Sequence, residues 1–162
     1  MSLLLTVLAL TLSLAACNGQ REAKANLAAS ASFMAANLKA PGVKTLPSGV
    51  QYRIVSSGPA DGPHPGPNDE VKVNYEGKLL DGKVFDSSFA RGEPADFALG
   101  GLIPAWVEAL QQMRPGDEWI LYVPPEMGYG DKASGPIPPN SVLIFKIQLL
   151  GVLPHPGGTQ LG

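Results

Sequence analysis

The chain has 162 residues, of which 44% are hydrophobic and 16% charged, with a formal net charge of −2. These values fit a single compact domain with an apolar core. No run of like charges occurs, so the clustered Lys and Arg residues with which proteins bind nucleic acid are missing. The 19 Gly and 16 Pro residues follow no period, which favours the turns of an antiparallel β protein over a fibrous repeat.

The first sixteen residues form an apolar segment that is typical of an export signal. This segment is shorter than the ~20 residues that a membrane-spanning helix needs, although Met1-Ser2 lacks the usual positive charge. Leu14-Ala15-Ala16-Cys17 resembles a bacterial lipobox, in which the cysteine thiol receives a diacylglyceryl group. We therefore expect residues 1–16 to be a lipoprotein signal peptide and Cys17 to carry lipid, palmitate included. An ordinary signal peptide cleaved near Ala16 is the alternative.

A lipid on Cys17 would attach the mature protein to a membrane of the bacterial cell envelope. Asn18 resembles the sorting residue of outer-membrane lipoproteins, so we expect an anchor in the outer membrane, facing the periplasm or the surface. Because Cys17 is the only cysteine and would be acylated, we expect no disulfide despite an oxidising compartment.

Residues 17–48 are predicted to form a lipid-anchored, partly helical spacer. Apolar residues recur at helical spacing between Arg21 and Ala40, and Pro41-Gly42 ends the pattern. The stripe consists of Ala23, Leu27, Ala31, Met34 and Leu38. A spacer between the anchor and the domain is the favoured interpretation. A dimer seam is the alternative, although a stable coiled coil usually needs about three or four heptads.

From Gly49 the hydrophobic pattern changes to the period of two that marks β-strands. Apolar and polar residues alternate in five segments, which we predict to be strands: 50–55, 71–76, 84–86, 119–123 and 143–149. Pro104 stands where proline is preferred, in the first turn of a helix that should run to about Met113. The apolar face of this helix would include Ile103, Trp106, Val107 and Leu110.

The connections between these elements determine the expected fold. We predict a flap at 87–96, a long Gly/Pro loop at 124–140 and a disordered tail at 154–162. Consecutive strands are joined too closely for helical crossovers, so the sheet should be mainly antiparallel, with the single helix on its apolar face. The sequence therefore predicts an α+β domain over residues 49–153.

The segment Val71 to Ser88, VKVNYEGKLLDGKVFDSS, resembles the signature of FKBP-type peptidyl-prolyl isomerases. The likeness continues in order through FALG, a helix bearing Trp106, MGYG, GPIPPNS and LIFKIQLL, and covers about Gly49 to Leu153. GVKTLPSGVQY and ARGEPADF are most similar to the bacterial macrophage infectivity potentiator class. The resemblance implies a bent antiparallel sheet of about five strands wrapped around one short α-helix. That class often carries a long helical dimerisation arm, and the shorter arm here argues against a dimer.

The family's active site is an aromatic pocket between the sheet and the helix. By motif position, the resemblance implies a catalytic set of eight residues: Tyr75, Phe85, Asp86, Phe97, Ile103, Trp106, Tyr129 and Phe145. It implies three further substrate-binding residues: Arg91, Leu102 and Ile137. Ala95 stands where many relatives carry an aromatic residue, and the turn before Ile103 is shorter by two residues. Both departures should alter the rim of the pocket and leave its floor intact.

The implied reaction is rotation about an X-Pro bond, which makes and breaks no covalent bond. A dry aromatic pocket would favour the less polar, twisted amide over the planar one. Trp106 would lie under the proline ring, while the Ile103 N–H and the Tyr129 hydroxyl would hold flanking carbonyls. Asp86 would be a fixed polar contact near the twisting imide, an ion-pair partner of Arg91, or both. We expect no cofactor and no metal.

We therefore expect a peptidyl-prolyl cis-trans isomerase, or rotamase, that accelerates the folding of exported proteins. Its partners would be unfolded or partly folded exported proteins with X-Pro bonds, and macrolide inhibitors of the FKBP class. A non-catalytic module or chaperone that binds Pro-containing segments in the envelope is the main alternative. A purely structural lipoprotein without a pocket is a third possibility.

Overall fold

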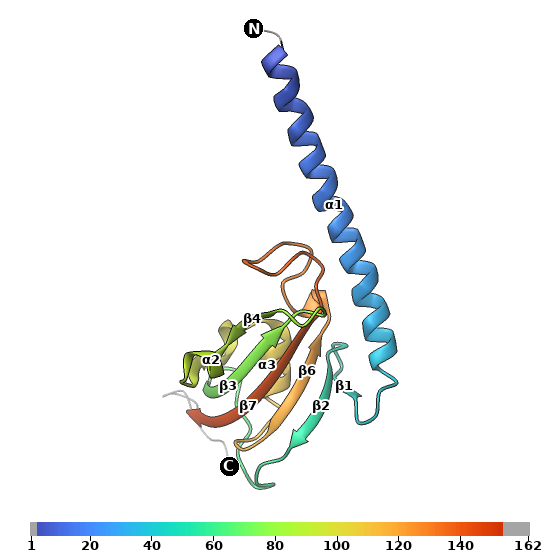
Figure 1. The fold of residues 1–162 in the computed structure, drawn as a ribbon. Coiled ribbons are helices and arrows are strands. Elements are labelled where there is room, and N and C mark those ends of the chain that lie inside the picture. The colour runs from blue at the N-terminus through green and yellow to red at the C-terminus, as the bar shows by residue number, and fades with distance from the viewer. Residues whose placement is uncertain (1–2, 154–162) are drawn as a thin grey trace.

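A long helix, α1 (Leu3–Asn37), leads into a β-rich domain in the computed structural model, which describes residues 3–153 (Figure 1). Seven strands follow α1: β1 (Lys44–Thr45), β2 (Gln51–Ser56), β3 (Glu70–Lys78), β4 (Val84–Ser87), β5 (Ala95–Ala98), β6 (Glu118–Val123) and β7 (Leu143–Leu153). Four short helical elements lie between them: α2 (Ser88–Arg91), the 3₁₀ turn η1 (Leu99–Gly101), α3 (Pro104–Leu110) and the 3₁₀ turn η2 (Pro125–Met127).

The strands form one sheet in which every pair is antiparallel, as predicted. Its order is β1-β2-β6-β7-β3-β4, and β5 pairs with β3 beyond the end of β4. All five predicted strands are present. The prediction of five strands and one helix was incomplete, because β1 has only two residues and because α2 and the first half of β5 lie in the segment predicted to be a flap.

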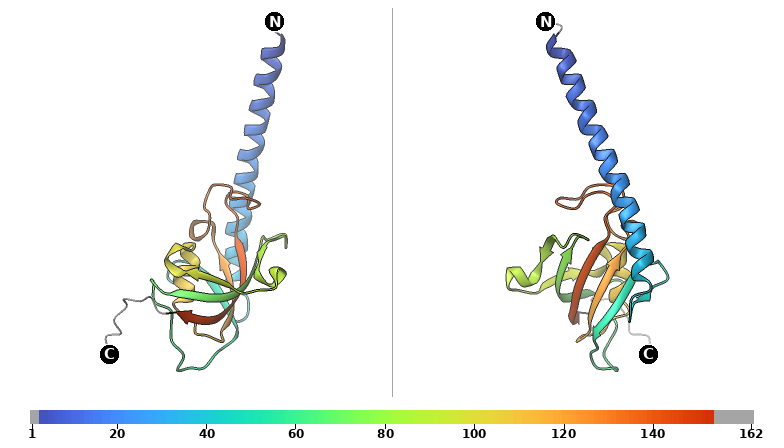
Figure 2. Two further views of the ribbon diagram at one scale, coloured as in Figure 1. Left: turned by 90° about the vertical axis from the view of Figure 1, so that its left-hand side faces the viewer. Right: turned by 45° about the vertical axis from the view of Figure 1, so that its right-hand side comes forward.

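The core lies between the inner face of the sheet and α3 (Figure 2). Every second residue of β7 is buried from Leu143 to Leu149, and β3 and β6 alternate in the same way. Pro104 begins α3 as predicted. The helix ends at Leu110 and not at Met113, although the Met113 N–H still donates to the Leu110 carbonyl in a final tight turn. The apolar pattern therefore predicted the inner layer correctly.

The outer face of the sheet is partly covered by α1, which the sequence did not indicate. Phe33 packs on Tyr122 of β6, with ring centroids 6.0 Å apart. The Gln51 side chain on β2 donates to the Met34 carbonyl and accepts from the Asn37 amide. Gln51 is consequently buried, whereas Ile54, farther along β2, is 39% exposed.

The apolar stripe predicted along α1 contacts the domain only in part, since Leu27, Ala31 and Met34 line a small pocket with residues of the domain. Leu27 and Leu38 are more than half exposed, at 53% and 54%. The hydrogen bonds to the domain come from the side chains of Asn26, Ser30 and Asn37 on the same helix. The surface that α1 meets offers backbone carbonyls and amides, so polar side chains of α1 supply these bonds.

Helix α1 also includes part of the predicted signal peptide. It is continuous from Leu3 through Cys17, and β1, which precedes the predicted domain start at Gly49, already pairs with β2. No helix within residues 3–153 is both long and apolar enough to cross a membrane. The predicted tail, residues 154–162, lies outside the described residues.

Ser88 closes the gap in the sheet between β4 and β5. β3 pairs with β4 from Glu76 onward and with β5 up to Val73, so Tyr75 has no strand partner on that side. The fully buried Ser88 hydroxyl accepts a hydrogen bond of 2.8 Å from the Tyr75 N–H. This bond replaces a strand at the point where β3 presents Tyr75 to the inner face.

We predict that Ser88→Ala lowers the free energy of unfolding by about 1–3 kcal/mol, because it leaves the buried Tyr75 N–H without an acceptor. Urea denaturation measures the change. Ser57→Ala is the matched control, since Ser57 is exposed and its substitution should change stability by less than about 0.5 kcal/mol. Equal stabilities of the two variants would contradict this role of Ser88.

Candidate active site

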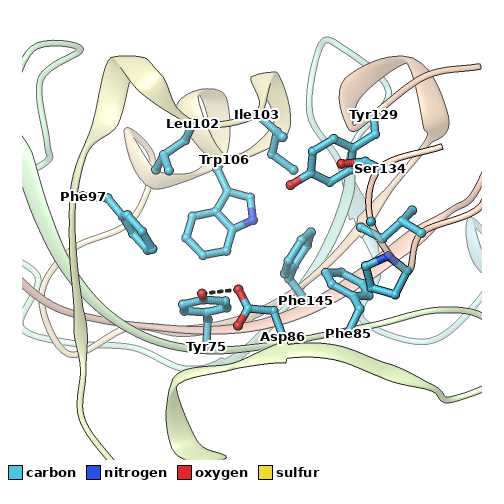
Figure 3. A pocket seen from close by; sticks show the side chains of 13 residues that line it. Tyr75, Phe85, Asp86, Phe97, Leu102, Ile103, Trp106, Tyr129, Ser134 and Phe145 are labelled. Carbon is cyan, nitrogen blue, oxygen red and sulfur yellow. Dashed lines mark hydrogen bonds between the residues drawn. The ribbon is translucent and has the colours of Figure 1, made fainter. Parts of the chain in front are cut away.

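A pocket of about 400 Å³ opens between α3 and the inner face of the sheet (Figure 3). Ten of the eleven predicted pocket residues line it: Tyr75, Phe85, Asp86, Phe97, Leu102, Ile103, Trp106, Tyr129, Ile137 and Phe145. The eleventh, Arg91, is 46% exposed and reaches the wall of the pocket through its guanidinium. Residues spread over seventy positions of the chain therefore converge on one cavity.

Trp106 is the centre of the pocket's aromatic floor. Its ring meets Tyr75 at a centroid distance of 5.2 Å and 85°, and Phe145 at 5.2 Å and 83°. Phe97 contacts it at 6.0 Å and 79°. These are edge-to-face contacts, the favourable arrangement for aromatic quadrupoles. The indole N–H is buried and has no hydrogen-bond partner within residues 3–153, so ring packing alone holds Trp106.

Gly77 allows two further rings to meet under the pocket. Phe85 and Phe145 contact edge to face at 5.6 Å and 89°, directly over the Gly77 backbone. A Cβ at Gly77 would lie 2.5 Å from Phe85 Cζ and 2.7 Å from Phe145 Cε1. Both separations are shorter than real Cβ contacts, so any side chain at this position must displace the rings.

Asp86, Tyr75 and Arg91 form a hydrogen-bonded network on the sheet side of the pocket. The Tyr75 hydroxyl donates to one carboxylate oxygen of Asp86, as Figure 3 shows, and Arg91 Nη1 donates to the other at 2.5 Å. Arg91 Nη2 also donates to the Tyr75 hydroxyl oxygen at 3.0 Å. The paired role predicted for Asp86 and Arg91 is therefore present in the geometry.

The same network shifts the pKa values of its members. Burial raises the pKa of Asp86, but the hydrogen bonds from Tyr75 and Arg91 outweigh burial, and the pKa lies below the ordinary value of 3.8. Burial and the bond to Asp86 raise the pKa of Tyr75 above its ordinary value of 10.0. Asp86 is thus a carboxylate, and Tyr75 a neutral phenol, throughout the physiological range.

The rim of the pocket is polar and more open than the floor. Ile103 is the N-cap of α3, and no acceptor for its N–H lies within the described residues. Tyr129, 43% exposed, directs its hydroxyl towards the pocket (Figure 3). Ser134, which lies next to Tyr129 in Figure 3, exchanges two backbone hydrogen bonds of 2.9 Å with Ile137, and the two residues form a small lip.

Sequence analysis missed three residues of this lip as site residues: Ser134, Gly135 and Pro136. Two of them belong to GPIPPNS, the segment from which Ile137 was selected, so adjacency was the available signal. Within residues 3–153, no cluster of three or more His, Cys, Asp and Glu residues could hold a metal ion. The pocket instead offers rings, one fixed carboxylate and a few hydrogen-bond donors.

A family model described as FKBP-type peptidyl-prolyl cis-trans isomerase matches residues 62–150, the part of the chain that builds this pocket. The chain belongs to the FKBP-type peptidyl-prolyl cis-trans isomerase family. A second model, for the domain amino-terminal to FKBP-type isomerases, matches residues 9–54 and so includes most of α1 and the start of this FKBP domain.

The relatives of this FKBP chain include proteins of the predicted macrophage infectivity potentiator class. The peptidyl-prolyl cis-trans isomerase Mip of Coxiella burnetii is 51% identical over 128 residues, covering 78% of this chain and 55% of the relative. The outer membrane protein MIP of Legionella longbeachae is 46% identical, covering 82% and 56%. The chain thus spans about half the length of these curated relatives.

The solved structure of FkpA from Escherichia coli matches this chain with a TM-score of 0.87 and 40% identity, covering 94% of this chain and 71% of FkpA. An isomerase structure from Pseudomonas syringae matches with a TM-score of 0.75 and 39% identity, covering 81% and 96%. These likenesses confirm the predicted FKBP fold.

We predict that Gly77→Ala lowers kcat/KM for an X-Pro peptide by about tenfold to a hundredfold, because displaced rings misplace the floor of the FKBP pocket. The protease-coupled isomerase assay measures this kcat/KM. Gly151→Ala in β7 is the control, since a Cβ there meets only Lys72 Cβ at an ordinary 3.9 Å. Similar activity of both variants would show that Gly77 does not support the pocket.

The pKa shifts predict a flat pH profile. Asp86 stays charged until the pH falls through its lowered pKa, and Tyr75 stays neutral until the pH rises through its raised pKa. We expect kcat/KM to be constant between about pH 5 and pH 9. The stability that Asp86 contributes should likewise be lost only below its ordinary pKa. A bell-shaped rate profile within this range would indicate general acid–base catalysis instead.

Proposed function

We propose that this chain is an active peptidyl-prolyl cis-trans isomerase that accelerates the folding of exported proteins. The observation that carries the proposal is the aromatic floor, in which Trp106 is held edge-on by Tyr75, Phe97 and Phe145. A cavity of about 400 Å³ accommodates a proline ring and the groups beside it.

The pocket suits a reaction whose barrier is electronic. Rotation about an amide breaks its resonance, at a barrier of about 18–20 kcal/mol. The planar amide has a larger dipole than the twisted one, so an apolar surface around the proline disfavours the planar ground state relative to the twisted transition state. This difference in binding accelerates rotation without a nucleophile or a proton donor.

Polar groups at the rim would fix the ends of the bound segment while the X-Pro bond turns. The Ile103 N–H is available to a substrate carbonyl, and the Tyr129 hydroxyl faces the same space. Asp86 presents a charged edge that Tyr75 and Arg91 prevent from moving. The carboxylate would then interact with the twisting imide at no cost of reorganisation.

We predict isomerase activity in the full chain, measured with a short X-Pro peptide in a protease-coupled assay. Asp86→Ala should lower kcat/KM by about tenfold or more, and Tyr129→Phe by about threefold to tenfold, since each removes a polar contact. Asp96→Ala and Tyr122→Phe are matched controls outside the pocket and should keep parental rates.

Turnover of the X-Pro peptide and binding of an FKBP-class macrolide together separate the candidate functions. Parental rates in Asp86→Ala and Tyr129→Phe would remove these residues from the site. A folded chain that binds an FKBP-class macrolide but does not accelerate the isomerisation would instead be a binding module or chaperone for Pro-containing segments. Failure to bind the macrolide as well would indicate a structural protein.

We further propose that the protein acts in the bacterial cell envelope, anchored by a lipid on Cys17. The support is the apolar segment before Cys17, the lipobox-like Leu14-Ala15-Ala16-Cys17, and a relative whose name places it in an outer membrane. Residues 17–48 would then connect the lipid to the isomerase domain, and Asn18 would direct it to the outer membrane.

We predict that Cys17→Ser moves the protein from the membrane fraction to the soluble fraction and abolishes its labelling by radioactive palmitate. The physical reason is that Cys17 supplies the only thiol in the chain to which the proposed lipid could be attached. Ser32→Ala, an exposed substitution on α1, is the control and should remain lipidated. Unchanged labelling of Cys17→Ser would contradict the lipid anchor.

A further inference from the structure

Helix α1 is hydrogen-bonded to the loop that carries the lip of the pocket. Ser30, which is 2% exposed, donates to the Asn140 carbonyl at 2.7 Å and accepts from the Val142 N–H at 3.1 Å. One turn earlier, Asn26 Nδ2 donates to the Pro139 carbonyl at 3.0 Å. In return, Asn140 Nδ2 donates to the Ala23 carbonyl at 3.0 Å.

These bonds hold the neck of a closed loop. The Asn140 N–H donates to the Gly130 carbonyl at 2.9 Å, which brings the two ends of residues 130–140 together. Asn140 has a φ of 57°, the only positive value at a non-glycine residue in the described part of the chain. Asn adopts this left-handed conformation more readily than other residues with a side chain, and at this position α1 makes two hydrogen bonds with Asn140.

The neck is joined to the pocket by short segments on both sides. Only Pro138 and Pro139 separate Asn140 from Ile137, and the proline rings restrict the backbone between them. On the other side, Gly130 directly follows Tyr129. A displacement of the neck is therefore transmitted to both rim groups. Figure 2 shows the loop beside α1 in both views.

We propose that α1 is a positioning element of the active site, in which Ser30, with Asn26 and Asn140, sets the placement of the lip Ser134–Ile137 and of Tyr129. The inference rests on the proposed function of the pocket and adds a determinant outside it. Ser30 does not line the pocket. It acts on the rim, which contacts the residues flanking proline, and not on the floor beneath the rotating bond.

Because Ser30 acts on the rim and not on the floor, we predict that its loss changes KM and leaves kcat nearly unchanged. Loss of the Ser30 hydroxyl should loosen the rim and raise KM for an X-Pro peptide by about threefold to tenfold, the range expected when a buried hydrogen bond is lost. The Trp106 floor is unchanged, so kcat should stay within about twofold. The dissociation constant of an FKBP-class macrolide should rise in parallel with KM.

The test compares the full chain with Ser30→Ala and Asn26→Ala, each checked by urea denaturation so that only folded protein is assayed. Asn26 is partly exposed, so its substitution is the milder one and should raise KM by about twofold to threefold. Ser32→Ala, two positions along the exposed side of α1, is the control and should match the parent.

Parental KM and macrolide affinity in both variants would overturn the proposal, and so would a fall in kcat at unchanged KM. If the parent chain binds the macrolide but shows no turnover, the proposed enzymatic function fails, while macrolide affinity in the variants still decides the role of α1. A parent chain that neither binds the macrolide nor turns over the peptide would overturn both.

Discussion

The pocket depends on how closely α3 can approach the inner face of the sheet. Ala105 and Ala109, both fully buried, face the sheet and let the short helix settle against it. Trp106 then meets rings from β3, β5 and β7 edge to face. The absence of a side chain at Gly77 leaves space for Phe85 and Phe145 below them. Three small residues thus make room for a continuous aromatic surface.

Because that aromatic surface favours the twisted amide, the polar groups of the site need not act as a nucleophile or as a proton donor. Burial and the hydrogen bond to Asp86 keep Tyr75 neutral, while the hydrogen bonds from Tyr75 and Arg91 keep Asp86 charged. Ser88 fixes the backbone of Tyr75 from the opposite side. The network is therefore rigid and insensitive to pH near neutrality, which suits a binding surface that stabilises a twisted amide better than a planar one.

The sequence was sufficient to predict which residues form the inner layer of the sheet and its helix. It was insufficient to predict the contacts of α1, the strand β5 and most of the lip. Alternation in β3, β6 and β7, with Pro104 and Trp106 on one helix, determines which residues face the core, because burial there follows hydrophobicity. The contacts of α1 follow hydrogen bonding instead. Ser30 and Gln51 are buried although Leu27 is exposed, because in the folded structure each donates a hydrogen bond to a backbone carbonyl. β5, with only four residues, and Ser134, Gly135 and Pro136 of the lip were missed because such short segments take their structure from tertiary contacts.

The most direct test of the account is two-dimensional exchange NMR on an X-Pro peptide with a substoichiometric amount of the protein. Uncatalysed rotation takes tens to hundreds of seconds, which is too slow to produce exchange cross-peaks. We expect exchange cross-peaks between the cis and trans resonances when the protein is added, and their loss when a macrolide fills the pocket above Trp106. A folded protein that binds the macrolide yet produces no cross-peaks would contradict the claim that this aromatic surface lowers the barrier to rotation.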